Sequence, residues 1–177
     1  NYNQEVSKPL MTPETAKEIL LSRDFQEEAW GSGNNTGVLN ITRVEKTNIL
    51  QITLETSEPQ QGVVLLNELI AQFEEKTEEQ YEQSIESLNK DLRNTEGELQ
   101  EINKRIKQTQ NLLNNPNISD VQQSELLNTL SRFTEQKNKL SDKKSQTEKK
   151  IDSMESMQVL EKPKATSSPV RPNKKLN

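Results

Sequence analysis

The sequence contains no cysteine and no histidine. This excludes a zinc site built from those residues, a Cys or His nucleophile and an imidazole base. Because the sequence also gives no convincing signal of a catalytic pocket, we expect no catalytic, cofactor-binding or metal-binding residue, and a protein that is not an enzyme. The lack of cysteine also fits an extracytoplasmic bacterial protein, although many cytosolic chains share it.

Apolar residues are also few, at 29% of 177 residues, with 3% aromatic. An ordinary globular domain has about 45–50% on a slightly wider definition. One compact globule of this length is thus excluded, whereas elongated helical structure needs apolar residues only along one seam. The net charge of −5 gives no reason to expect a nucleic-acid partner, which would require a basic face.

Long hydrophobic runs are missing as well. The longest, Val63 to Leu66, is far shorter than the roughly 20 residues that span a bilayer. The chain shows no signal peptide and does not begin with Met. We expect it to be a fragment of a longer protein.

The first part of the chain predicts two helices and a pair of strands. Thr12 is a suitable N-cap before Pro13, and Ser22 breaks this helix and starts a shorter one that ends at Trp30. Alternating apolar residues predict strands over 38–44 and 49–55, paired antiparallel through a short connector. Because two strands alone are marginal in water, a third is expected, either from 157–160 or from sequence before residue 1.

A long helix is predicted next, with Ser57 as its cap. Its first turns carry an apolar stripe expected to cover the sheet, formed by Val63, Leu66, Ile70 and Phe73. The acidic cluster that follows, Glu74, Glu75, Glu78 and Glu79, is typical of a solvated helix face rather than of a cation site.

Beyond Phe73 the apolar residues alternate steps of four and three, which indicates a heptad seam. The first arm of this seam comprises Tyr81, Ile85, Leu88, Leu92, Thr95, Leu99, Ile102, Ile106, Thr109 and Leu113. A break at Asn115, Pro116 and Asn117 follows. The second arm comprises Leu126, Leu130, Phe133, Lys137, Leu140, Lys144, Thr147, Ile151 and Met154, with the two lysines as polar seam residues that set register.

Folding the chain back about Pro116 matches one arm to the other. It pairs Ile106 with Leu126 and Leu99 with Phe133, and continues to Leu88 with Lys144 and Tyr81 with Ile151. The sequence therefore predicts an antiparallel hairpin of about 37 residues per arm, roughly 55 Å long.

The predicted fold class is α+β, a small mixed α/β base domain with a long antiparallel helical hairpin (coiled coil) projecting from it. The base comprises 1–77, the hairpin 78–156 with its turn at 114–118, and a return strand with a Pro-rich segment 157–177 completes the base. In that last segment three prolines favour an extended chain.

Two stretches resemble the periplasmic domain of Wzz-type polysaccharide co-polymerases, the chain-length determinant family. One is the strand 49–56 followed by Ser57, Glu58 and Pro59. The other, more specific, is the Pro-rich stretch 165–176, which is similar to the family's motif before its second membrane helix. The residues of this motif are Pro169, Pro172, Asn173, Lys174 and Lys175.

The resemblance implies a bacterial inner-membrane protein whose segment here is periplasmic. It implies a homo-oligomeric ring that regulates the chain length of a surface polysaccharide of the O-antigen type in lipopolysaccharide biosynthesis. The partners would be a membrane polysaccharide polymerase, with contact to the growing polysaccharide, and the membrane through flanking helices before Asn1 and after Leu176. The family has no catalytic residues to transfer.

Other interpretations remain open. Some relatives act in exopolysaccharide or capsule export with a tyrosine kinase, and a non-enzymatic coiled-coil scaffold needs none of these partners. An efflux-type adaptor would require β-rich modules on both sides of the hairpin. A prefoldin-like chaperone would place its strands between the two helices, where this chain has only a tight turn.

Overall fold

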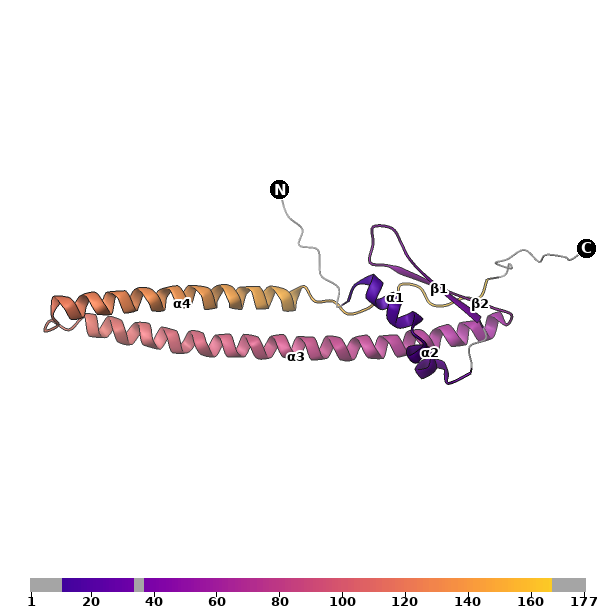
Figure 1. Ribbon diagram of the computed structural model, residues 1–177, viewed down its shortest axis with the longest axis horizontal. Coiled ribbons are helices and arrows are strands. Elements are labelled where there is room, and N and C mark those ends of the chain that lie inside the picture. Colours follow the sequence, from indigo (N-terminus) through magenta and orange to yellow (C-terminus); the bar gives the residue numbers. More distant parts are fainter. Residues whose placement is uncertain (1–10, 34–36, 167–177) are drawn as a thin grey trace, which may run out of the picture. The chain divides into compact units, whose positions relative to one another are not determined.

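The computed structural model describes residues 11–33 and 37–166, which combine helix and sheet (Figure 1). This confirms the mixed class that the sequence predicts. The elements are α1 (Pro13–Leu21), α2 (Arg23–Trp30), β1 (Gly37–Arg43), β2 (Leu50–Thr56), α3 (Pro59–Leu113) and α4 (Asp120–Asp152). The described residues divide into two compact units. The hairpin unit is Glu82–Met154, and the sheet unit comprises 11–81 and 155–166; α3 runs through both.

The two short helices begin where the sequence predicts. The Thr12 hydroxyl accepts a hydrogen bond from the backbone N–H of Thr15 at 3.2 Å, which caps α1. Ser22 ends α1 and caps α2, because its extended backbone turns the chain and its hydroxyl accepts from the Phe25 N–H. The predicted break at Ser22 is confirmed.

Strands β1 and β2 pair antiparallel, as predicted, with bounds that differ by one residue. Leu39 lies opposite Leu54 and Ile41 opposite Ile52, so the apolar residues share one face. The connector holds Lys46 at a φ of 58°, the left-handed conformation of a tight turn.

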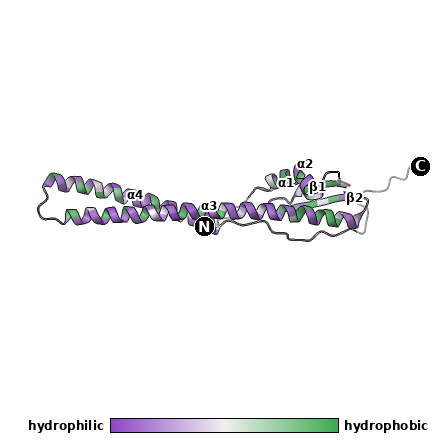
Figure 2. Ribbon diagram, turned by 90° about the horizontal axis from the view of Figure 1, so that it is seen from below, coloured by the Kyte–Doolittle hydropathy of each residue, from purple (hydrophilic) through white to green (hydrophobic). Residues whose placement is uncertain are grey.

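The core of the sheet unit forms where the short helices meet the start of α3. Trp30 is buried, and its Nε1–H donates to the carbonyl oxygen of Leu65 at 2.7 Å. The rings of Phe25 and Phe73 meet edge to face at 6.0 Å between centroids. The buried members of this core are Ala16, Leu20, Phe25, Trp30, Ile41, Leu65, Leu69 and Phe73. Figure 2 shows hydrophobic residues gathered on these elements, whereas the rest of α3 and α4 is mainly hydrophilic.

The first turns of α3 correct the predicted stripe. Leu65 and Leu69 are buried in the core, while Val63, Leu66 and Ile70 are only half-buried. Apolar residues on this part of α3 occupy a wider part of the helix circumference than one stripe. The packing of α1 and α2 determines which of these residues are buried. Of the predicted stripe, Phe73 alone belongs to the core cluster.

The start of α3 also differs from the prediction of a Ser57 cap. The helix begins at Pro59, and the Glu58 carbonyl accepts the N–H of Gly62. Proline suits the first helical position and keeps the preceding residue out of the helix, so the cap position moves to Glu58.

The predicted return strand at 157–160 is wrong. Within the described residues the sheet has two strands, and 157–160 carries no strand. Met157 packs at the edge of the core cluster, whereas Leu160 is 71% exposed. An apolar run of this length does not form a strand unless it lies against a sheet edge, and here it does not extend the sheet of β1 and β2.

Candidate functional site

The hairpin unit is the first candidate site, because it brings two seams together. Figure 1 shows the second part of α3 and α4 side by side and antiparallel, and Figure 2 agrees. Every predicted seam position from Ile85 to Met154 is buried or half-buried, while most positions between them are exposed. The half-buried apolar members are Ile85, Leu88, Leu92, Leu99, Ile106, Leu113, Leu126, Leu130, Phe133, Leu140, Ile151 and Met154, and Ile102 is buried. Tyr81 is half-buried and belongs to the sheet unit.

Threonines are the most buried polar residues of the seam. Thr95 is 0% exposed, and Thr109 and Thr147 are nearly as buried. Each hydroxyl donates to the carbonyl oxygen four residues earlier in its own helix, at 2.9–3.0 Å. Because this bond is local, the polar groups are satisfied without a partner on the other arm.

Lys144 provides an ion pair between the two arms. Its ammonium lies 2.9 Å from Oε1 of Glu96 on α3 and 3.8 Å from Oε1 of Glu148 on its own helix. The hydrogen bond to Glu96, followed by the Glu96 charge, raises the pKa of Lys144 above its usual 10.5. Lys144 is 35% exposed, which fits a seam lysine whose ammonium reaches the edge of the interface.

This ion pair contradicts the predicted register. Fold-back about Pro116 places Lys144 opposite Leu88, eight residues from Glu96. Eight residues are roughly 12 Å along a helix, and the gap between helix axes adds roughly 8–10 Å. In the predicted register, the side chains of Lys144 and Glu96 would bridge this combined separation only in fully extended conformations. A surface hollow of the hairpin also contradicts the predicted register. Leu92 lines this hollow together with Glu148 and Ile151, whereas its predicted partner Leu140 does not line it.

A shift of one heptad explains both observations. It also explains why α4 begins beyond the last turn of α3 in Figure 1. The shifted register again brings seam to seam, and it places Thr95 opposite Lys144 beside Glu96. The layers of this register are Leu113 with Leu126, Thr109 with Leu130, Ile106 with Phe133, Ile102 with Lys137, Leu99 with Leu140, Thr95 with Lys144, Leu92 with Thr147, Leu88 with Ile151 and Ile85 with Met154.

The connection between the arms lies where the sequence places it. α3 ends at Leu113, and Ser119 starts α4 with a capping box that it shares with Gln122. Asn115, Pro116 and Asn117 are exposed, and the Asn115 side-chain oxygen accepts the Asn117 N–H at 3.0 Å. The predicted turn residues therefore sit at the end of the hairpin.

The sheet unit holds the second candidate site, a groove of about 1640 Å³. Its walls are β2, one side of α3 and the extended segment 155–166. The groove explains where the remaining predicted stripe residues lie, because Val63, Leu66 and Ile70 line it. Other apolar lining residues include Leu50, Ile52, Leu54, Phe73 and Met157.

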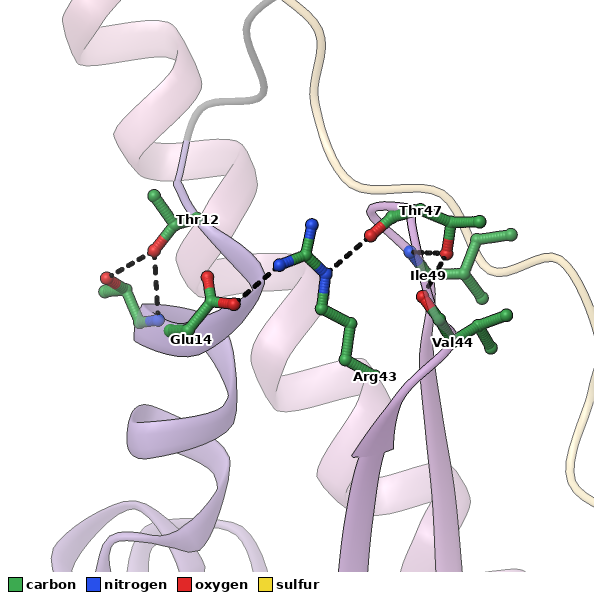
Figure 3. Close-up of polar contacts among 7 residues, drawn as sticks. Thr12, Glu14, Arg43, Val44, Thr47 and Ile49 are labelled. Atoms are coloured by element: carbon green, nitrogen blue, oxygen red, sulfur yellow. Dashed lines mark hydrogen bonds and ion pairs between the residues drawn. The ribbon is translucent and has the colours of Figure 1, made fainter.

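A polar contact fixes the end of the strand pair in the same unit. The guanidinium of Arg43 donates to the Glu14 carboxylate at 2.7 Å and to the Thr47 carbonyl at 2.6 Å (Figure 3). A bond from the Glu14 backbone, followed by the charge of Arg43, lowers the pKa of Glu14. Arg43 thus joins α1 to the connector between the strands. The sequence does not indicate this contact, because the three residues come from different elements and follow no periodic pattern.

The acidic stretch of α3 does not gather into a cluster of metal-ligand geometry. Among the described residues, no group of three or more acidic side chains is placed to hold a metal ion. Glu78 accepts a hydrogen bond from the Ser156 hydroxyl at 3.1 Å, and Glu74 and Glu75 are exposed. Nor is any helix in the described part both long and apolar enough to cross a membrane. The Pro-rich motif, Pro169 to Lys175, lies outside the described residues.

Comparisons with known proteins add no family to this description. No family model matches the chain, and no curated protein or solved structure matches it.

Proposed function

We propose that this chain is the periplasmic domain of a non-enzymatic polysaccharide co-polymerase of the Wzz type, anchored in the bacterial inner membrane. In this proposal the sheet unit is the base and the hairpin projects from it. Copies assemble head to tail into a ring and, with a membrane polymerase, set the length of a surface polysaccharide of the O-antigen type. The growing polysaccharide is a further partner.

One observation carries the proposal: a single helix, α3, belongs both to a small α/β unit and to a two-arm seam. The order of elements, with two helices, a strand pair and a Pro-initiated long helix before the hairpin, supports the family resemblance. So does the Pro-rich stretch that ends the sequence.

The proposed mechanism is geometric. Repeated copies in head-to-tail contact form a closed ring when the rotation between neighbours closes, and an open filament otherwise. The hairpins would then form a wall around a chamber, and the size of that wall would limit the polysaccharide. No bond is made or broken by the domain, which is consistent with a chain that has no Cys or His.

The test shortens the hairpin in the full-length protein without changing its seam. Deleting 99–112 and 127–140 removes two heptads, roughly 21 Å, from each arm. It retains the connection and the Lys144 ion pair. The protein is expressed in a bacterium that lacks its own chain-length determinant, and the polysaccharide length distribution is measured on gels.

We expect the shortened hairpin to change the modal polysaccharide length. The control is an undeleted protein with Lys104→Gln and Lys139→Gln, two exposed changes that leave the hairpin length intact. The mass of the full-length protein in detergent is measured in parallel, and a ring is expected. An unchanged length distribution in the deleted protein would refute the proposal, and a monomer in detergent would favour a coiled-coil scaffold.

A further inference from the structure

The apolar seam residues of the two arms can be paired in two registers. In the observed register the purely apolar layers include Leu113 with Leu126, Ile106 with Phe133, Leu99 with Leu140 and Leu88 with Ile151. One heptad away, in the fold-back about Pro116, they include Ile106 with Leu126, Ile102 with Leu130, Leu99 with Phe133 and Leu92 with Leu140. The apolar layers alone therefore do not favour one register over the other.

A seam lysine lies beside Glu96 in either of these two registers. Lys144 contacts Glu96 at 2.9 Å in the observed register. Lys137 stands one heptad before Lys144 on the same seam and is half-buried. If α4 moved by one heptad, Lys137 would take the place that Lys144 now holds beside Glu96. Residues one heptad on either side of Glu96 are Asn89 and Asn103, so the equivalent positions of the neighbouring heptads carry no charge.

We propose that the hairpin has two registers, one heptad apart, and that Glu96 pairs with Lys144 in one register and with Lys137 in the other. The two registers differ by a displacement of α4 along α3 of about 10 Å. The six residues between Leu113 and Asp120 are within the usual length of a helix–helix connection, so they accommodate either arrangement. This inference does not depend on the proposed function.

The observed register is favoured by a second carboxylate. Lys144 also lies 3.8 Å from Glu148, one turn further along α4. The residue in the same relation to Lys137 is Ser141, which has no charge. The preference is small, because ion pairs exposed to this degree contribute only modestly to stability. Loss of the Lys144 pair should therefore populate the second register.

The absence of native cysteine makes the register directly measurable in the full chain. Two cysteine pairs share position 99: Leu99→Cys with Leu140→Cys reports the observed register, and Leu99→Cys with Phe133→Cys reports the second. Both pairs join equivalent seam positions, so their geometry is matched. Each is oxidised at low protein concentration, and the intramolecular disulfide is quantified by mass spectrometry, first alone and then with Lys144→Met or Lys137→Met.

We expect Lys144→Met to raise the ratio of the 99–133 to the 99–140 disulfide by about two- to fivefold. Lys137→Met should lower this ratio, because it removes the pair of the second register. These opposite shifts distinguish the proposal from simple loosening of the hairpin, which would move both variants in the same direction. An unchanged ratio in Lys144→Met, shifts of the same sign, or a 99–133 product absent from every variant would overturn it.

Discussion

The ammonium of Lys144 lies 2.9 Å from Oε1 of Glu96 and joins the two arms of the hairpin. This contact places Thr95 opposite Lys144 and moves the register one heptad from the symmetric fold-back. The contacts of Lys144 with Glu96 and Glu148 thus favour this register over the one a heptad away, in keeping with the role of polar seam residues in coiled coils.

A charge in the seam should loosen the hairpin. Leu99→Asp replaces a half-buried layer residue with a carboxylate that has no partner, and we expect the free energy of unfolding to fall by roughly 2–4 kcal/mol. Phe133→Asp should act in the same direction. The measurement is urea unfolding followed by far-ultraviolet circular dichroism. Gln100→Asp, at the next and exposed position, should change stability by no more than about 0.5 kcal/mol. Equal midpoints for the two substitutions would contradict the layer assignment.

Two glycines should respond in opposite ways to alanine. At Gly37 an added Cβ would lie 2.5 Å from the Glu55 carbonyl oxygen, so Gly37→Ala must displace backbone and should cost about 1–3 kcal/mol. At Gly97, inside α3, an added Cβ meets nothing within 4 Å, so Gly97→Ala should stabilise by about 0.5–1 kcal/mol. Thermal melts of the two variants test the pair, and a loss of stability at Gly97 would show that the backbone there is not an open helix.

The sheet unit has its own reporter, because Trp30 is the only tryptophan and is buried. Leu69 is 0% exposed, and Leu69→Ala should lower the free energy of unfolding by roughly 2–5 kcal/mol through the cavity it leaves. The measurement is urea unfolding followed by Trp30 fluorescence. Val64→Ala provides the control, since Val64 is 47% exposed and should change the midpoint little. The core assignment would be wrong if both substitutions had the same effect.

Acid should weaken the contact between α1 and the strand connector. The pKa of Glu14 is lowered from 4.5, so its carboxylate contributes stability above that value and loses the contribution as the pH falls through the lowered pKa. Glu14→Gln should therefore reduce the acid dependence of stability below about pH 4.5. Urea midpoints measured across this range in low salt test the expectation. Glu18→Gln, an exposed change on the same helix, is the control, and identical pH profiles for Glu14→Gln and the unmodified chain would contradict it.

Local features of the fold could be predicted from the sequence. Thr12 and Ser22 cap helices because their hydroxyls reach backbone N–H groups a few residues on, which depends on nearby residues only. The strand pair follows from alternation, and the seam from heptad spacing. The burial of Thr95 and Thr147 also follows from their place in that spacing.

Long-range features could not be predicted in the same way. A heptad pattern is unchanged by a shift of one heptad, so the spacing did not distinguish the predicted fold-back about Pro116, which is wrong, from the register in which Glu96 lies beside Lys144. The side of α3 that enters the core depends on where α1 and α2 pack, which explains why Leu65, outside the predicted stripe, is buried while Leu66 is half-buried. The Arg43 contact to Glu14 joins residues far apart in the chain, and no local pattern indicates it.

The threonines of the seam have a mechanical consequence. Each buried hydroxyl bonds to a carbonyl of its own helix, so these residues form no directional bond between the arms. The Thr109 and Thr147 layers therefore rest on packing against Leu130 and Leu92, whereas the Thr95 layer also has the ion pair between Lys144 and Glu96. Under a pulling force or a bending load, the hairpin should open at the Thr109 and Thr147 layers before it opens at the Thr95 layer.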